Sequence, residues 1–174
     1  MHARRKAAFA LASAAAMAGT LLATAPPAQA YGTLDVRYAR VDTDNCDRIS
    51  GTLPVTPAPG GCYLYDSLDD TYFEKDADGE ALKVEVRNAG RLVSKVEFHP
   101  KGENLWIYDP AADGDTVYVR LWTKTHGWSA VFYATGDQNP HVVPFDFAEG
   151  ENVLIEIYDH SDATDRIASF SARA

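Results

Sequence analysis

The chain has 174 residues and a formal net charge of −9 at pH 7, with 25 acidic residues against 16 Lys and Arg. This length is sufficient for one domain with its own hydrophobic core. Because phosphate backbones and anionic membranes repel an acidic protein, the composition excludes nucleic acid as the expected partner.

The first thirty residues have the pattern of a secretory signal peptide. Basic residues at positions 4–6 precede an Ala-rich apolar run, and the Ala-Gln-Ala at positions 28–30 is typical of a cleavage site. An uncleaved membrane anchor is the alternative, which the preceding Pro-Pro pair disfavours. No later run reaches the roughly 18 apolar residues that a membrane span requires. We therefore expect residues 1–30 to be removed and residues 31–174 to form a single secreted, monomeric domain.

The sequence contains two cysteines, Cys46 and Cys62. Outside the cell, where conditions are oxidising, an even pair predicts a disulfide. The enclosed segment DRISGTLPVTPAPGG is rich in Pro and Gly. We therefore expect this segment to have little regular structure of its own and to be held in place by the disulfide.

The remaining sequence alternates between short strand patterns and turn residues. The expected strands cover residues 33–41, 62–65, 71–74, 82–87, 92–98, 104–108, 116–123, 128–134, 152–158 and 167–171, with a shorter one at 141–145. No segment has a sustained helical period. This pattern predicts an all-β fold, an antiparallel β-sandwich of roughly eight to ten strands that is Ig-like or jelly-roll-like.

The segment HPKGENLWIYDPAADGDTVYV at residues 99–119 combines a Gly-Glu pair, a strand, and an acidic Asp-Gly turn that leads to another strand. In this respect the chain resembles small exported bacterial β-sandwich proteins that have no assigned activity. The resemblance extends over about residues 32–159. It implies a secreted all-β protein and no catalytic residues.

The stretch EKDADGEALKVE at residues 74–85 has the acidic spacing of an EF-hand calcium loop. However, Glu85, at the last ligand position, falls within an alternating strand, whereas an EF-hand loop lies between two helices. We therefore expect a β-hairpin with Asp78 and Gly79 at its tip, because both residues accept the left-handed backbone that such a turn requires.

Two later acidic turns are the better candidates for a calcium site. If every connection reverses the chain, the turns at 109–115 and 160–165 lie at one end of the domain and the turn at 76–79 lies at the other. Their candidate ligands are Asp109, Asp113, Asp115, Asp162 and Asp165. Solvated turns are the favoured interpretation, because Asp forms local hydrogen bonds in turns. The sequence thus predicts no cofactor, with calcium as the alternative.

Aromatic residues recur at strand period in two segments. Trp106 and Tyr108 alternate with aliphatic residues, and Tyr118 and Trp122 do the same around Arg120. A hairpin of these strands would place all five side chains on one face of a sheet, opposite Leu105, Ile107, Val117 and Val119. Such a face suits the rings of a polysaccharide, with Arg120 as a hydrogen-bond donor. The alternative is that loops or the N-terminal segment cover the face, or that it is itself part of the core.

The common local motifs of catalysis are absent from the sequence, including G-x-S-x-G, H-E-x-x-H and a Gly-rich phosphate loop. We therefore expect a secreted, non-catalytic module that binds an extracellular polymer or protein, such as polysaccharide or cell-wall material. Two alternatives are kept. In the first, the protein is an inhibitor or effector that acts through the disulfide loop. In the second, it is a small hydrolase, whose carboxylate pair leaves no local motif.

Overall fold

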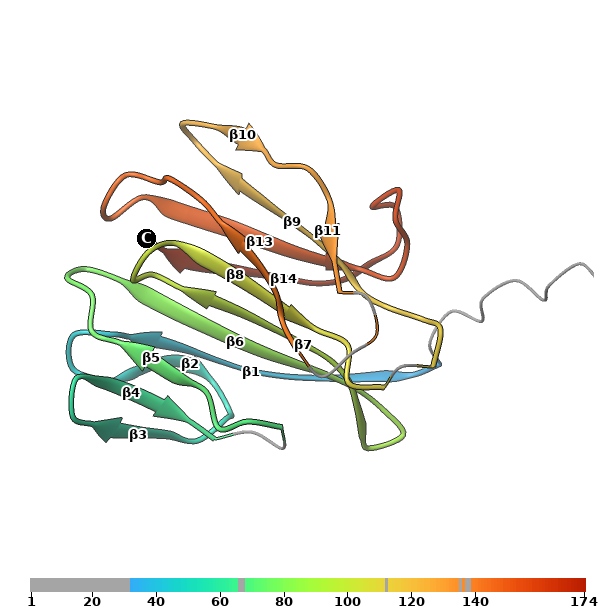
Figure 1. Ribbon diagram of the computed structural model, residues 1–174, viewed down its shortest axis with the longest axis horizontal. Helices are drawn as coiled ribbons and strands as arrows, with labels where there is room; N and C mark the ends of the chain where they lie inside the picture. Colours follow the sequence, from blue (N-terminus) through green and yellow to red (C-terminus); the bar gives the residue numbers. More distant parts are fainter. Residues whose placement is uncertain (1–31, 66–67, 112, 135, 137–138) are drawn as a thin grey trace, which may run out of the picture.

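The structure is a computed structural model that describes residues 32–65, 68–111, 113–134, 136 and 139–174 (Figure 1). The predicted signal peptide lies outside these residues. Throughout the described ranges the regular elements are all β-strands, and a helix capable of crossing a membrane does not occur there. The all-β prediction is confirmed.

The strands pair antiparallel and belong to two sheets. They are β1 (Leu34–Asp42), β2 (Arg48–Gly51), β3 (Val55–Ala58), β4 (Gly61–Leu64), β5 (Tyr72–Glu74), β6 (Glu80–Asn88), β7 (Arg91–His99), β8 (Asn104–Tyr108), β9 (Tyr118–Thr123), β10 (Gly127–Trp128), β11 (Phe132–Tyr133), β12 (His141–Pro144), β13 (Asn152–Tyr158) and β14 (Arg166–Arg173).

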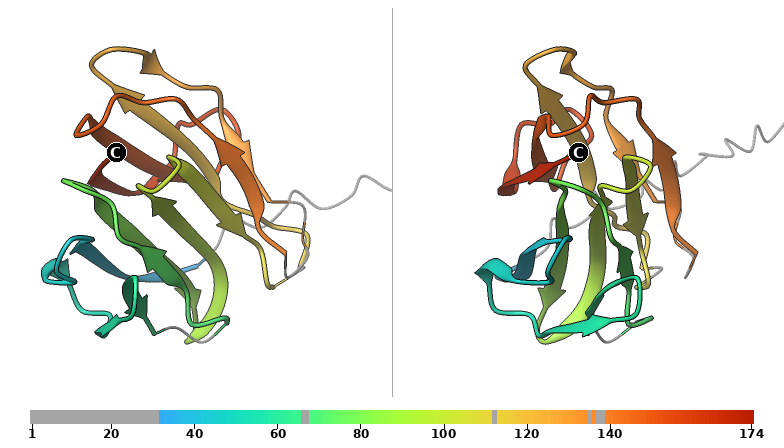
Figure 2. Two further views of the ribbon diagram at one scale, coloured as in Figure 1. Left: turned by 60° about the vertical axis from the view of Figure 1, so that its left-hand side comes forward. Right: turned by 90° about the vertical axis from the view of Figure 1, so that its left-hand side faces the viewer.

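The larger sheet, sheet A, has 11 strands in the order β10-β9-β13-β14-β6-β7-β8-β12, with β1 paired to β6 and β2, and β11 paired to β9. Its two halves are joined at a narrow place, where β14 pairs with β6 through Arg173 and Glu80 alone. A salt bridge of 2.7 Å between these two side chains strengthens the joint. The sheet curls strongly about this joint, so that its two halves face each other (Figure 2).

The main hydrophobic core fills the space between the two halves of sheet A. Its largest buried members from β6, β7 and β8 are Leu82, Val84, Phe98, Leu105 and Ile107, and those from β9 and β13 are Val119, Leu121, Val153, Ile155 and Ile157. A β-sandwich of two separate sheets is not confirmed, because one continuous, curled and open sheet supplies both sides of this core.

The smaller sheet, sheet B, contains β3, β4 and β5 and covers the outer face of sheet A around β1 and β6. A second apolar cluster joins the two sheets, with Val41 and Ala81 from sheet A and Leu64 and Phe73 from sheet B. Within this cluster lies the disulfide between Cys46 and Cys62, which confirms the predicted pairing.

Because of sheet B, the middle of sheet A is buried on both faces. Residues 81–86 of β6 and 93–99 of β7 are all buried, although charged side chains alternate with apolar ones along both strands. By contrast, β9 keeps the alternation of buried and exposed residues that is typical of a sheet with one face toward solvent.

Twelve of the 14 strands observed in the described ranges overlap expected segments, and three details differ. Residues 47–61, expected to lack regular structure, supply β2 and β3. The expected strand at 128–134 is divided into β10 and β11. Residues 78–79 do not form the tip of a β-hairpin, because β5 and β6 belong to different sheets. The turn instead connects the two sheets, with Asp78 at φ 61° and with the Thr43 hydroxyl bonded to the Gly79 carbonyl at 2.9 Å.

Removing the disulfide should destabilise the fold. The bond closes a loop with a sequence separation of 16 residues, for which chain entropy predicts a contribution of about 3 kcal/mol. The Cys46→Ala/Cys62→Ala variant should lose about this free energy of unfolding in urea denaturation. Equal stability of the variant and the oxidised wild type would contradict this role.

Candidate functional site

The five residues of the predicted aromatic face are divided between the two halves of sheet A. Strands β8 and β9 do not pair, because β8 lies between β7 and β12 while β9 lies between β13 and the β10–β11 edge. The prediction that the five side chains form one surface is therefore wrong. The alternation itself is correct, since Leu105, Ile107, Val117 and Val119 are all buried in the core.

The two aromatic residues of β8 face sheet B, and they differ in burial, since Trp106 is half-buried at its margin. Tyr108 is buried, and its hydroxyl donates a hydrogen bond of 2.9 Å to Asp69 Oδ2. The Trp106 ring stacks on His99 at 4.5 Å, and His99 stacks in turn on Phe73 of β5 at 4.4 Å. The N-terminal part of the domain thus covers Tyr108 and leaves Trp106 partly exposed.

The other half remains open and forms what we call the aromatic edge, made of Tyr118, Trp122, Trp128 and Tyr133. Cross-strand pairing places Trp128 directly opposite Trp122, and Tyr133 directly opposite Tyr118. Residues opposite each other in a sheet project from the same face. Trp122, Trp128 and Tyr133 are exposed to 38%, 45% and 47%, so the edge presents a row of rings to solvent.

Arg120 lies between these rings and is held in place by its neighbours. Its guanidinium carbon is 3.9 Å from the centre of the Trp128 ring, which is a cation–π contact. The same group donates hydrogen bonds of 3.1 Å to Glu156 and 2.6 Å to the Tyr158 hydroxyl. These contacts fix Arg120 and, through it, support the orientation of Trp128.

Glu156 is the anion that balances this arrangement. Its carboxylate is almost fully buried and also accepts a hydrogen bond of 2.5 Å from Arg166. Burial acts to raise the pKa of the Glu156 carboxyl, but hydrogen bonds from Tyr158, Arg166 and Arg120 outweigh it, so the pKa lies below its ordinary value. Glu156 is therefore ionised at neutral pH and holds Arg120 below Trp128.

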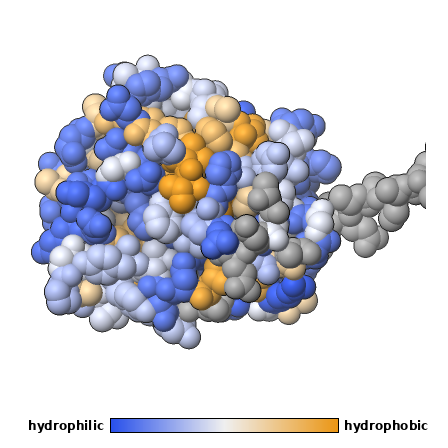
Figure 3. Space-filling model, viewed as in Figure 1, coloured by the Kyte–Doolittle hydropathy of each residue, from blue (hydrophilic) through white to orange (hydrophobic). Residues whose placement is uncertain are grey.

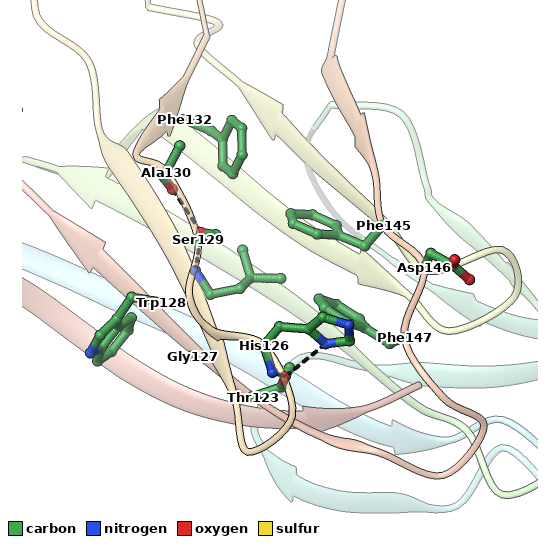
Figure 4. A pocket seen from close by; sticks show the side chains of 11 residues that line it. Thr123, His126, Gly127, Trp128, Ser129, Ala130, Phe132, Phe145, Asp146 and Phe147 are labelled. Carbon is green, nitrogen blue, oxygen red and sulfur yellow. Dashed lines mark hydrogen bonds between the residues drawn. The ribbon is translucent and has the colours of Figure 1, made fainter.

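A pocket of about 420 Å³ opens on the opposite side of the β9–β10 hairpin. Figure 4 shows Phe132 and Phe145 on either side of it and Trp128 pointing away from it. The rings of Phe145 and Phe147 stack at 4.9 Å. The pocket lies where β11 and β12 approach each other across the open side of sheet A, and apolar side chains gather on this face of the molecule (Figure 3).

The polar groups around this pocket include Ser129, His126 and Thr123. The Ser129 hydroxyl accepts a hydrogen bond of 2.9 Å from the Leu121 amide and donates one of 2.7 Å to the Ala130 carbonyl. His126 Nδ1 lies 3.2 Å from Thr123 Oγ1 and 3.8 Å from a carboxylate oxygen of Glu151. At the break between β10 and β11, the Ser129 hydroxyl thus takes the place of a main-chain hydrogen-bond partner of the Leu121 amide. This is a structural role.

The two acidic turns chosen as calcium candidates lie at the same end of the molecule, on the right in Figure 1, and the turn at 76–79 lies at the other end. The charge of His160 acts on both Asp115 and Asp162. The two turns are therefore close enough to interact.

Local hydrogen bonds engage several of these carboxylates. Asp113 accepts from the Asp115 amide at 3.3 Å, and Asp162 accepts from the Thr164 amide at 3.2 Å. Asp109 is buried, and Asp165 accepts a main-chain hydrogen bond of 2.9 Å from Asp159 through its carbonyl. Among the described residues, no three His, Cys, Asp or Glu side chains are placed to hold a metal ion.

A cluster of buried charges beneath sheet B was not foreseen from the sequence. Lys95 Nζ lies 3.0 Å from Glu97 Oε1, and Lys83 Nζ lies 3.5 Å from the same oxygen. Burial acts to raise the pKa of the Glu97 carboxyl, but His99, Lys95 and Lys83 outweigh it and bring the pKa below its ordinary value. Alternation of Lys and Glu with apolar residues does not distinguish a solvated face from a covered one, and the apolar residues of β4 and β5 are the signal of a cover.

Comparisons of the chain with models of protein families, with curated proteins and with solved structures found no match.

The three tryptophans should differ in their access to solvent. In variants that keep one tryptophan and replace the other two by Phe, acrylamide should quench Trp122 and Trp128 strongly, because both rings are exposed, and Trp106 less, because it is half-buried and its ring stacks on His99. Equal quenching of all three would show that sheet B does not cover β8.

Glu156 should stabilise the protein in a pH-dependent way. A carboxylate with a lowered pKa stabilises the folded state above its ordinary value of 4.5, and the contribution disappears as the pH falls through the folded pKa. Glu156→Gln should therefore lower the free energy of unfolding by about 2–3 kcal/mol near neutral pH. The difference from wild type should shrink toward about pH 3.

The matched control is Glu149→Gln, which changes an exposed carboxylate in the turn before β13. This variant should have nearly the stability of the wild type at every pH. A deficit for Glu156→Gln that does not change with pH would refute the assignment.

Proposed function

We propose that the protein is a secreted, non-catalytic module that binds a neutral extracellular polysaccharide on the aromatic edge. The observation that carries the proposal is the pair of exposed indole rings, Trp122 and Trp128, directly opposite each other on adjacent strands. Flat aromatic rings bind the apolar faces of sugar rings, and they lose little conformational entropy in doing so.

The length of the edge supports a polymer as the ligand. Tyr118 and Trp122 are four residues apart on β9, which corresponds to about 13 Å along a strand. Tyr133 and Trp128 accompany them on the neighbouring strands. A surface of this length is larger than one sugar ring, so several rings of a chain can contact it together.

The charge of the molecule supports a neutral ligand. With a net charge of −9 the protein repels anionic polymers over a long range. The guanidinium of Arg120, the cation nearest to the rings, is already balanced by Glu156. A neutral glycan avoids the repulsion and still finds aromatic faces and hydrogen-bonding groups.

The predicted signal peptide and the disulfide support a location outside the cell, since disulfides persist in oxidising compartments. The resemblance to small exported bacterial proteins agrees with this proposal. The inhibitor or effector alternative gains no comparable observation, because residues 48–51 and 55–58 of the disulfide loop are built into the sheets.

The proposal can be tested by titrating the protein with soluble neutral polysaccharides, such as a β-glucan, a xylan and a mannan, and following tryptophan fluorescence and heat. At least one should bind and perturb the indole emission. Trp128→Ala should then weaken binding by about tenfold or more, which corresponds to about 1.4 kcal/mol, because this ring is an exposed anchor of the surface.

The matched control is Tyr65→Ala. Tyr65 is 59% exposed but lies beside sheet B, away from the aromatic edge, so its removal should leave the affinity unchanged. The proposal fails if no neutral polysaccharide binds, or if Trp128→Ala binds as tightly as the wild type.

A further inference from the structure

A lysine and an aspartate meet at the margin of the buried charge cluster. Lys95 projects from β7 beneath sheet B, and its side chain is fully buried. Its ammonium group contacts the Oδ1 atom of Asp69, which precedes β5 and is 38% exposed at its side chain. Glu97 Oε1 lies 3.0 Å from the same nitrogen, so an amine, a carboxyl group and a second carboxylate share one site.

We propose that Lys95 and Asp69 are joined by an intramolecular isopeptide bond that the folded protein forms by itself, with Glu97 as the group that carries the proton. The bond is an amide between Lys95 Nζ and Asp69 Cγ. It links the segment before β5 to the middle of sheet A. This inference does not rest on the polysaccharide-binding function.

The reaction balances without an oxidant, a cofactor or a second substrate. A proton passes from the Lys95 ammonium to Asp69 Oδ1, which gives a neutral amine beside a carboxylic acid. The amine nitrogen attacks Cγ, and one of its two protons passes through Glu97 to Oδ1. The C–Oδ1 bond then breaks, water leaves, and the amide keeps Oδ2 as its carbonyl oxygen and one hydrogen on nitrogen.

The neighbouring side chains suit each part of this reaction. The Tyr108 hydroxyl donates a hydrogen bond of 2.9 Å to Oδ2, where negative charge develops when the nitrogen attacks. The Thr71 hydroxyl is 2.9 Å from the departing Oδ1 and also contacts Glu97. It therefore lies on the path by which a proton from Glu97 reaches the leaving oxygen.

Burial of the Lys95–Asp69 pair supplies the driving force for amide formation, and the contact between the two groups supplies the rate. The Tyr108 ring lies 3.9 Å from Lys95 Nζ and covers it. A charged pair in such a place carries a desolvation penalty, which ends when both charges disappear into a neutral amide. Groups held in contact in a reactive orientation also react as if one were present at about 10⁵–10⁸ M. The partial exposure of Asp69 gives the released water a way out.

Mass spectrometry of the exported protein, reduced and denatured, tests the proposal. The wild type should have a mass lower than its sequence by one water. A tryptic digest should contain one branched peptide in which the strand segment with Lys95 is linked to the segment with Asp69. A full sequence mass, with these two peptides found separately, would overturn the proposal whatever the variants do.

Variants identify the groups that react. Asp69→Ala and Lys95→Arg should both have the full sequence mass, and Glu97→Gln should form the bond at least tenfold more slowly during refolding. Lys83→Arg is the matched control: Lys83 also contacts Glu97, but it donates to the Leu64 carbonyl, and this variant should still lose one water. Loss of water that persists in Lys95→Arg would show dehydration elsewhere, such as succinimide formation at an Asp-Gly pair, and would refute the bond.

Discussion

The fold depends on the burial of charged side chains between two sheets. Along β6 and β7 one face is aliphatic and packs in the main core, while the other face carries Lys83, Lys95 and Glu97. Each of these charges is removed from water, and leaving one without its counter-charge would cost about 3–5 kcal/mol. Sheet B makes their burial possible because it covers the cluster, and the segment that leads into β5 contributes Thr71 and Asp69 as partners. The disulfide keeps the covering segment close to the face that it covers.

This cover makes the two halves of sheet A different. In the half formed by β6, β7 and β8, strands β6 and β7 are buried on both sides, and Tyr108 of β8 has become part of the interior. The half formed by β9 and β13 has no such cover, and its outer face is stabilised locally by Arg120 and Glu156. Large exposed apolar patches are uncommon on protein surfaces. Here the ion pair of Arg120 and Glu156 supports the Trp128 ring from below.

The sequence predicts the strands well, because their signal is local. Alternation around Leu105 and Val119 correctly assigned the core side of β8 and β9, and the cysteine pair correctly indicated a disulfide. What failed was the pairing of strands that follow one another in the chain. The sheet order separates β8 from β9, and that order depends on contacts between distant segments, such as Arg173 with Glu80. Alternation cannot distinguish a solvated face from one covered by another sheet. The burial of Tyr108, Lys83 and Lys95 could therefore not be predicted from alternation.

If the buried charges join sheet B to sheet A, sheet B is an integral part of the folded unit. Native-state hydrogen exchange measures this directly, because amides that open only with the whole molecule share one free energy and one dependence on denaturant. We predict that the protected amides of β4 and β5 exchange at the same free energy as those of β7. Exchange of β4 and β5 at a clearly lower free energy, by an opening that leaves β7 protected, would contradict it.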